Sequence, residues 1–484
     1  MDSRIWQHPI IDFGERKGRE IYFNFNGKPI KAYEGETIAA ALYASGVRVF
    51  GRSIRFQRPR GWFCAIGKCS SCLMKVDGIP NVRTCITLVK DGMNVEYQDP
   101  RPNLPEKTEF ECEHVKVETD IAVIGGGPAG LSAILSLNEL GVDSLIIDEN
   151  PWLGGQLIKQ THKFFGSKAS YAGIRGIKIA EILLGELRKE NVKSLENSSV
   201  IACYREGKGF KITAVKGHST LYEIDAKGLL VATGAMENML AFPNNDLPGV
   251  CGAGGVQTLM NVYGVKPGEN ALMVGAGNVG LIVAYQLAQA GVNVKMIVEA
   301  APKIGGYLVH AAKVRRMGIP ILTRHSIKAA IGKDHVEGAV ITKLDENWNP
   351  IEGTEFEVEV DLICLAVGLT PSTEILMQIG CEHAYVPELG GHVAIHDKFL
   401  KTTLDNVYLA GDVSGIEEAS TAMMEGKIAA ATVAIDMGVN VEKAENLRKK
   451  SLHELELLRS SPFSKRVITG KEKVYSLMEE ISCG

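Results

Sequence analysis

The chain contains the same strand, turn, helix and strand pattern twice, and this repeat constrains its fold more than any other feature. In the first copy, "IAVIGGGPAGLSAILSLNELGVDSLIIDEN", an apolar strand leads into a turn with Gly125, Gly127 and Gly130, and the next strand ends at Asp148. These glycines suit a tight turn, backbone approach to a pyrophosphate and close packing of helix on strand. Asp148 can accept hydrogen bonds from a ribose. The pattern predicts a dinucleotide-binding unit.

The second copy, "LMVGAGNVGLIVAYQLAQAGVNVKMIVEA", ends at Glu299, which takes the place of Asp148. It predicts a second Rossmann-like unit inserted in the first. An acid at this position suits a free ribose 2′-hydroxyl and repels a 2′-phosphate, so NAD(H) or another adenine nucleotide such as ATP is favoured over NADP(H). The alternative is a domain that keeps only its fold. The expected binding residues are Gly275, Gly277, Asn278, Val279, Gly280 and Glu299.

Two further segments, "LLVATGA" at 229–235 and "NVYLAGDVSG" at 406–415, follow apolar strands. With the first glycine-rich turn they resemble the three signatures of two-dinucleotide-binding flavoproteins, in which the aspartate matching Asp412 binds the ribityl chain of FAD. Taken alone, Asp412 is also explained as a helix N-cap. The residues that the resemblance implies for FAD are Gly125, Gly127, Pro128, Ala129, Gly130, Asp148, Glu149, Gly154, Gly155, Gln156, Thr233, Gly234, Gly411 and Asp412.

Four of the ten cysteines lie in one short segment, "CAIGKCSSCLMKVDGIPNVRTC". Hairpin patterns flank it, so the order of strand, strand, helix, cysteine loop and hairpin is that of a ferredoxin-like β-grasp domain. Small residues between the thiols let several sulfurs point inward. The loop resembles that of plant-type [2Fe-2S] ferredoxins, which implies a cluster bound by Cys64, Cys69, Cys72 and Cys85. A structural zinc site and a set of free buried thiols are the alternatives.

The segments "GKPIKAYEGETIAAALYASGVRVFGRSIRFQRPRG" and "NNDLPGVCGAGGVQTLMNVYGVKPGENALMVGAG" narrow the family. They resemble the α subunit of heteromeric amine-oxidising flavoenzymes, such as sarcosine oxidase, dye-linked L-proline dehydrogenase, opine oxidase and hydrogen cyanide synthase. Disulfide reductases with two Rossmann-like units need a redox dithiol beside the flavin, but Cys251 has no CxxC partner. The chain also stops without the folate-binding tail of longer sarcosine oxidase α subunits.

This resemblance implies an electron-transfer subunit of a proline- or sarcosine-class dehydrogenase or oxidase. A catalytic β subunit of the amino-acid-oxidase type would oxidise the amine. Further components would be FMN at a subunit boundary and a small ferredoxin-like subunit. No catalytic residue is assigned here, because the substrate site would lie in the partner. A self-sufficient NADH-dependent flavin and iron–sulfur oxidoreductase is the alternative. A third possibility makes the cluster and nucleotide domains structural supports.

The charge and length of the chain limit its other properties. A formal net charge of −4, with both signs mixed along the chain, argues against nucleic acid as a partner. The chain begins without a signal-peptide pattern, and its apolar runs are shorter than a bilayer requires, so we expect a cytoplasmic protein without an integral membrane segment. In this α/β chain we expect a ferredoxin-like domain at 1–110, an FAD domain at 115–243 and 362–484, and an inserted nucleotide domain at 244–361.

Overall fold

The chain folds into two compact units, each made of two separate stretches of sequence. The computed structural model describes residues 2–16, 18–103, 112–217 and 219–483. Unit 1 comprises Met1–Thr108 and Glu237–Gly368, and unit 2 comprises Glu109–Met236 and Leu369–Gly484. The expected ferredoxin-like and inserted domains therefore share one unit. The last change of unit, after Gly368, follows the strand Leu362–Leu365, which we expected to begin the last FAD segment.

The N-terminal part of unit 1 has the predicted β-grasp arrangement. Its mixed sheet has the strand order β2-β1-β7-β5-β6, formed by β1 (Glu20–Phe25), β2 (Lys28–Tyr33), β5 (Leu73–Val76), β6 (Ile79–Arg83) and β7 (Asn94–Glu96). Asn26 and Gly27 both have positive φ, as a two-residue hairpin requires. Helix α2 (Ile38–Ala44) begins after Thr37, whose side chain accepts a hydrogen bond from the Ala40 amide. These local elements confirm the sequence prediction.

The rest of unit 1 is built on a parallel sheet. Its order is β15-β22-β16-β17-β18, formed by β15 (Val250–Gly252), β16 (Asn270–Val274), β17 (Asn293–Glu299), β18 (Ile321–Thr323) and β22 (Leu362–Leu365). The helices are α5 (Ala253–Asn261), α6 (Asn278–Gln289) and α7 (Leu308–Arg316). A separate antiparallel sheet contains β19 (His325–Ile331), β20 (Gly338–Lys343) and β21 (Phe356–Val358).

The cysteine-bearing loop packs directly on this second part of unit 1. Phe63 and Cys64 belong to the same buried apolar cluster as Leu247 and Val250. The Gly252 amide donates to the Phe63 carbonyl at 3.2 Å. These contacts explain why the two expected domains form one unit.

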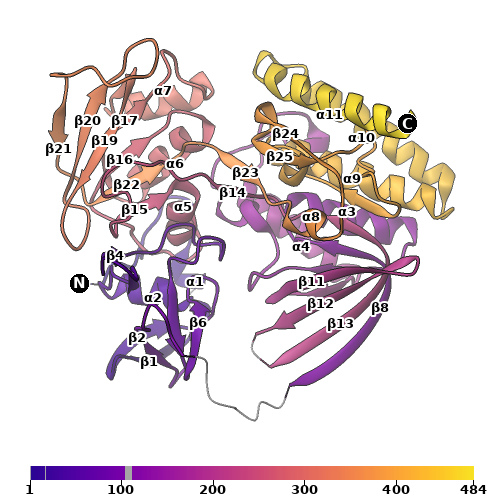
Figure 1. The fold of residues 1–484 in the computed structure, drawn as a ribbon, viewed down its shortest axis with the longest axis horizontal. Coiled ribbons are helices and arrows are strands. Elements are labelled where there is room, and N and C mark those ends of the chain that lie inside the picture. The colour runs from indigo at the N-terminus through magenta and orange to yellow at the C-terminus, as the bar shows by residue number, and fades with distance from the viewer. Residues whose placement is uncertain (1, 17, 104–111, 218, 484) are drawn as a thin grey trace. The chain divides into compact units, whose positions relative to one another are not determined.

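Unit 2 contains a larger sheet whose strand order is β10-β9-β8-β13-β12-β11, with β26 beside β13. Its strands are β8 (Glu113–Ile124), β9 (Ser144–Ile147), β10 (Lys193–Leu195), β11 (Ser198–Glu206), β12 (Gly209–Lys216), β13 (Thr220–Val231) and β26 (Val407–Leu409). The pairs among β8, β9, β10, β13 and β26 are parallel, whereas β11, β12 and β13 form an antiparallel meander that is visible in Figure 1.

The main helices of unit 2 are α3 (Pro128–Leu140), α4 (Gly176–Lys189), α9 (Ala419–Asp436), α10 (Val441–Arg459) and α11 (Lys465–Cys483). Helices α3 and α9 cross at very short distance, because a Cβ placed on Gly426 would lie 2.2 Å from the Ala129 carbonyl oxygen. No helix in the described parts of the chain has the length and apolar character of a membrane span.

We predict that Gly426→Ala lowers the free energy of unfolding by about 1–3 kcal/mol, because the added methyl group would meet backbone atoms of α3 that cannot move independently. The matched control is Gly185→Ala in α4, where an added Cβ meets no atom within 4 Å. That variant should be unchanged or more stable by up to about 1 kcal/mol, the helix-propensity difference. Thermal and urea unfolding followed by circular dichroism measure both effects. Equal stability of the two variants would contradict the close crossing.

Candidate functional site

The three predicted flavin signatures begin at the same edge of the unit 2 sheet. Strands β8, β13 and β26 run parallel, and their last residues, Ile124, Val231 and Leu409, are register partners. Each signature follows the carboxyl end of its strand. Parallel α/β sheets bind ligands at such an edge, so segments almost 300 residues apart in sequence are brought to one place (125 against 411).

These signatures also contact one another through backbone and small side chains. A Cβ on Gly125, whose φ is +109°, would lie 2.2 Å from the Ala232 carbonyl oxygen. A Cβ on Gly411 would lie 2.8 Å from that of Ala129. Thr233 donates its hydroxyl to the Ser372 carbonyl at 2.6 Å, which fixes the second signature. Larger residues at either glycine would push the signatures apart.

Asp148 ties the glycine-rich turn to the end of β9. Its Oδ2 accepts from the Gly126 amide at 2.6 Å and its Oδ1 from the Asn150 amide at 2.7 Å. Burial raises the pKa of this carboxyl group. Oδ1 also accepts from the Asn150 side-chain amide at 2.9 Å, whereas Oδ2 accepts only the Gly126 bond and keeps acceptor capacity for a ribose.

A second pair of glycines supports the turn from outside. The Gly154 amide donates to the Gly126 carbonyl at 2.8 Å, and a Cβ on Gly155 would lie 2.7 Å from the Gly127 Cα. Helix α3 begins at Pro128 without a side-chain cap, so its first amides keep the capacity to bind an anion. Of the remaining predicted residues, Glu149 is half-buried and Gln156 is exposed. This cradle fits the pyrophosphate and adenosine part of FAD.

Asp412 is the first residue of a single 3₁₀ turn, Asp412–Ser414, and Gly411 occupies the capping position. The structure therefore does not support the N-cap alternative. The Glu417 amide donates to Asp412 Oδ1 at 3.2 Å. Burial among protein atoms raises the pKa of Asp412 to about 7. A half-buried carboxyl group with this acceptor capacity is suited to hydroxyl donors.

The second glycine-rich turn, in unit 1, repeats the geometry of the first. Gly275 has a φ of +106°, and its Cβ would lie 2.2 Å from the Ala366 carbonyl oxygen. Glu299 Oε2 accepts from the Ala276 amide at 2.7 Å, as Asp148 does from Gly126. Asn278 Oδ1 accepts from the Tyr307 amide at 2.8 Å, and Val279 is exposed. A Cβ on Gly277 would meet no atom within 4 Å, which leaves room for a nucleotide.

The structure brings the four cysteines of the unit 1 loop together. Cys64 is hydrogen-bonded to Cys69 and Cys85, and Cys85 is hydrogen-bonded to Cys72. The bonds from Cys69 and Cys85 hold the pKa of the Cys64 thiol far below its ordinary value, whereas the pKa of the donors Cys69 and Cys85 is raised. These contacts link the four thiols in the order Cys69, Cys64, Cys85 and Cys72. The described residues contain no group of three or more acidic, histidine or cysteine side chains arranged for a single metal ion.

The backbone of this loop is folded around the thiols. Ala65, Gly67 and Ser70 have positive φ, and backbone hydrogen bonds from Ile66 and Cys69 reach the Cys64 sulfur. Such a set of buried thiols with backbone donors fits an iron–sulfur cluster, whose sulfurs accept amide hydrogen bonds. Cys112, Cys203, Cys251, Cys364 and Cys381 are also free. Cys251 is buried and donates to the Trp62 carbonyl at 3.6 Å, and burial raises its pKa.

Sequence reasoning missed two groups of residues near these sites. Gly305 and Gly306 support the second turn as Gly154 and Gly155 support the first, since a Cβ on Gly306 would lie 2.8 Å from the Gly277 carbonyl carbon. The repeated "GG" was the available signal. The second group is a set of buried charges behind Asp412, for which the sequence offers no local signal.

Comparisons with known proteins agree with this geometry. Residues 119–438 match the family model of pyridine nucleotide-disulphide oxidoreductases, and residues 18–100 match that of the 2Fe-2S iron-sulfur cluster binding domain. The first match covers more than half of the chain, and the two matches together support FAD and a 2Fe-2S cluster as the cofactors.

Several relatives are subunits of oxidases. The alpha subunit of sarcosine oxidase from Corynebacterium sp. (strain U-96) is 26% identical over 440 residues, covering 85% of this chain and 43% of the relative. One opine oxidase subunit, from Rhizobium meliloti, is 28% identical over 360 residues, covering 69% of this chain and 66% of the relative. The chain thus spans less than half the length of the sarcosine oxidase relative.

A solved structure extends the similarity to the fold. The crystal structure of L-proline dehydrogenase from P. horikoshii is 27% identical, with a TM-score of 0.68, and the match covers 92% of this chain and 79% of that chain. The expected similarity to α subunits with an N-terminal cluster domain is confirmed. The chain belongs to the pyridine nucleotide-disulphide oxidoreductase family and is an FAD-dependent oxidoreductase with an N-terminal 2Fe-2S cluster-binding domain.

Proposed function

We propose that this chain is the electron-transfer subunit of a heteromeric amino-acid dehydrogenase or oxidase of the proline or sarcosine class. The observation that carries the proposal is the combination of a thiol cluster and two nucleotide cradles in a chain similar both to the alpha subunit of sarcosine oxidase and to L-proline dehydrogenase. FAD accepts electrons in pairs and releases them singly, whereas an iron–sulfur cluster carries one at a time. A separate catalytic subunit of the amino-acid-oxidase type supplies the substrate site.

The residue assignments follow from the two cradles. The unit 2 cradle holds FAD, with Gly127 and Asp148 on the adenosine and pyrophosphate side and Asp412 on the ribityl chain. The unit 1 cradle, with Glu299 at its ribose end, holds NAD(H) or another adenine nucleotide. Cys64, Cys69, Cys72 and Cys85 hold the 2Fe-2S cluster. The hydrogen bonds and open glycine positions described above support each assignment.

A second candidate function is supported by the unit 1 cradle itself. Its turn repeats the first one in φ, in glycine contacts and in the acid that anchors it. A chain with an intact NADH site and a flavin would reduce an acceptor without a partner. The two candidates differ in which reductant bleaches the flavin.

We predict that proline or sarcosine reduces the flavin of the purified chain only when a catalytic partner is present. The substrate site would lie in that partner, so the isolated chain should keep its visible flavin absorption with either amino acid. Anaerobic stopped-flow mixing measures this with NADH, proline and sarcosine in turn, with and without the partner. Rapid bleaching by NADH alone would favour the second candidate. If none of the three reductants bleached the flavin, with or without the partner, the chain would instead be a structural support.

We predict that Cys72→Ser removes the cluster and leaves the flavin in place, because the thiols and the flavin signatures belong to different units. The variant should lose the cluster's visible absorption and its paramagnetic signal in the reduced state. Turnover with a one-electron acceptor should fall by more than about tenfold, since single electrons lose their carrier. Cys112→Ser, at an exposed free cysteine, is the control. Stoichiometric zinc without acid-labile sulfide in the wild type would contradict the assignment.

We predict that NADH binds the unit 1 cradle at least about tenfold more tightly than NADPH, because a 2′-phosphate would face the Glu299 carboxylate. ATP should also bind more tightly than NADPH. Glu299→Gln keeps an acceptor for the Ala276 amide and removes the charge, so it should reduce the difference in affinity between NADH and NADPH. Isothermal calorimetry measures the dissociation constants. Equal or tighter binding of NADPH to the wild type would disprove this selectivity.

A further inference from the structure

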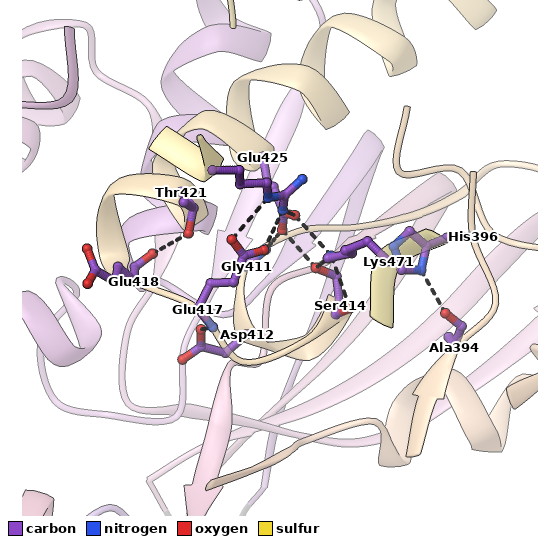
Figure 2. A network of polar contacts seen from close by, with 11 residues as sticks. Ala394, His396, Gly411, Asp412, Ser414, Glu417, Glu418, Thr421, Glu425 and Lys471 are labelled. Atoms are coloured by element: carbon purple, nitrogen blue, oxygen red, sulfur yellow. Dashed lines mark hydrogen bonds and ion pairs between the residues drawn. The ribbon is translucent and has the colours of Figure 1, made fainter. Parts of the chain in front are cut away.

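A group of buried charges lies directly behind the turn that carries Asp412. We define this charge cluster as Glu417, Glu425, Arg459 and Lys471 together with Ser414. Glu425 and Lys471 are each only 2% exposed, and Ser414 is fully buried. Figure 2 shows Glu425, Ser414 and Lys471 converging beside Gly411 and Asp412. Two cations balance two anions, as buried charges require.

Glu425 is the centre of the charge cluster. Its Oε1 accepts from Arg459 at 2.7 Å and from Lys471 at 3.0 Å. Its Oε2 accepts from the Gly411 amide at 2.9 Å and from the Ser414 hydroxyl at 2.8 Å. Burial alone would raise the pKa of Glu425, but the two cations hold it at about 2, so the side chain is a carboxylate at neutral pH. One side of this carboxylate binds cations and the other binds the turn.

Both cations come from the two C-terminal helices. Arg459 is the last residue of α10, and Lys471 lies in α11. Lys471 donates to the Ser414 hydroxyl at 2.6 Å and to the Ser414 carbonyl at 3.1 Å, as well as to Glu425. A lysine ammonium group has three donor hydrogens, so these partners account for all of them.

Arg459 reaches Asp412 by a second route. Its guanidinium binds both carboxylate oxygens of Glu417, and the Glu417 amide donates to Asp412 Oδ1. Gly411, which precedes Asp412, and Glu417, which binds its carboxyl group, are thus both held by the C-terminal helices. Gly411 is held through Glu425, and Glu417 is held through Arg459.

Stability alone is a weak explanation for this arrangement. Buried ion pairs lose much of their attraction to desolvation, and apolar replacements are often neutral or stabilising. What the charges provide here is orientation, because two hydrogen bonds from the turn 411–414 to Glu425 and two from Lys471 to Ser414 leave the turn little freedom. We propose that Lys471 and Arg459 are positioning residues that fix the turn 411–414 for FAD. This inference rests on the proposed role of Asp412.

The test compares Lys471→Met with Lys473→Met in the full-length chain. Lys473 lies two residues further along α11 and forms an exposed ion pair with Glu388, which is not part of the charge cluster. Lys471→Met should raise the dissociation constant of FAD by about tenfold, a loss typical of one charge-assisted hydrogen bond. It should also change the visible circular dichroism of the bound flavin. Lys473→Met should leave both unchanged.

Flavin release is followed by its fluorescence, at a temperature where circular dichroism shows the flavin-free variant to be folded. An unchanged dissociation constant in folded Lys471→Met would overturn the inference. If that variant does not fold, Ser414→Ala is used, because it removes the hydroxyl's bonds to Glu425 and Lys471 and leaves the ion pairs in place. Unchanged FAD binding in Ser414→Ala would then overturn it.

Asp412→Ala separates this inference from the assignment on which it rests. Full flavin retention in Asp412→Ala would refute the ribityl assignment and with it the inference. If Asp412→Ala loses FAD while Lys471→Met and Ser414→Ala retain it, the ribityl assignment stands and the positioning role is refuted.

Discussion

The flavin region of this protein depends on backbone atoms that approach one another where side chains would not fit. Gly125 brings the first turn against Ala232, and Gly426 brings α9 against Ala129. These contacts hold the carboxyl ends of β8, β13 and β26 in one place. The amides at the start of α3 and the carboxyl group of Asp412 consequently lie at the same edge, although distant parts of the chain supply them.

Much of this arrangement could be predicted because its signals are local. An Asn-Gly or Asp-Gly pair between alternating strands specifies a hairpin within a few residues. A strand, glycine-rich turn, helix and terminal acid specify a dinucleotide cradle within about 30 residues. The spacing of Cys64, Cys69 and Cys72 likewise acts over a single loop. In each case the interacting groups are close in sequence, so the local sequence pattern is sufficient to predict the local structure.

The features that escaped prediction depend on contacts between distant segments. Lys471 lies in a helix rich in charges, a pattern typical of a solvated surface, and nothing near it in sequence indicates that it is buried. Its partner Glu425 is 46 residues away in the sequence. The packing of the cysteine loop on the second part of unit 1 could not be predicted for the same reason. It depends on Gly255, where a Cβ would lie 2.3 Å from the Phe63 carbonyl oxygen, and a single glycine in a helix does not reveal its neighbour.

The two glycine-rich turns give the molecule an internal reference. Their leading glycines differ by only 3° in φ (109° against 106°), and a Cβ added to either would lie 2.2 Å from a carbonyl oxygen. Any difference in nucleotide binding between the two turns must therefore originate outside their shared backbone conformation. The nearest differences are Ala276, which replaces Gly126 within the turn, and Asn278 and Val279, which replace Pro128 and Ala129 at the start of the helix. If Pro128-Ala129 and Asn278-Val279 were exchanged, each turn would serve as the reference for the nucleotide affinity of the other.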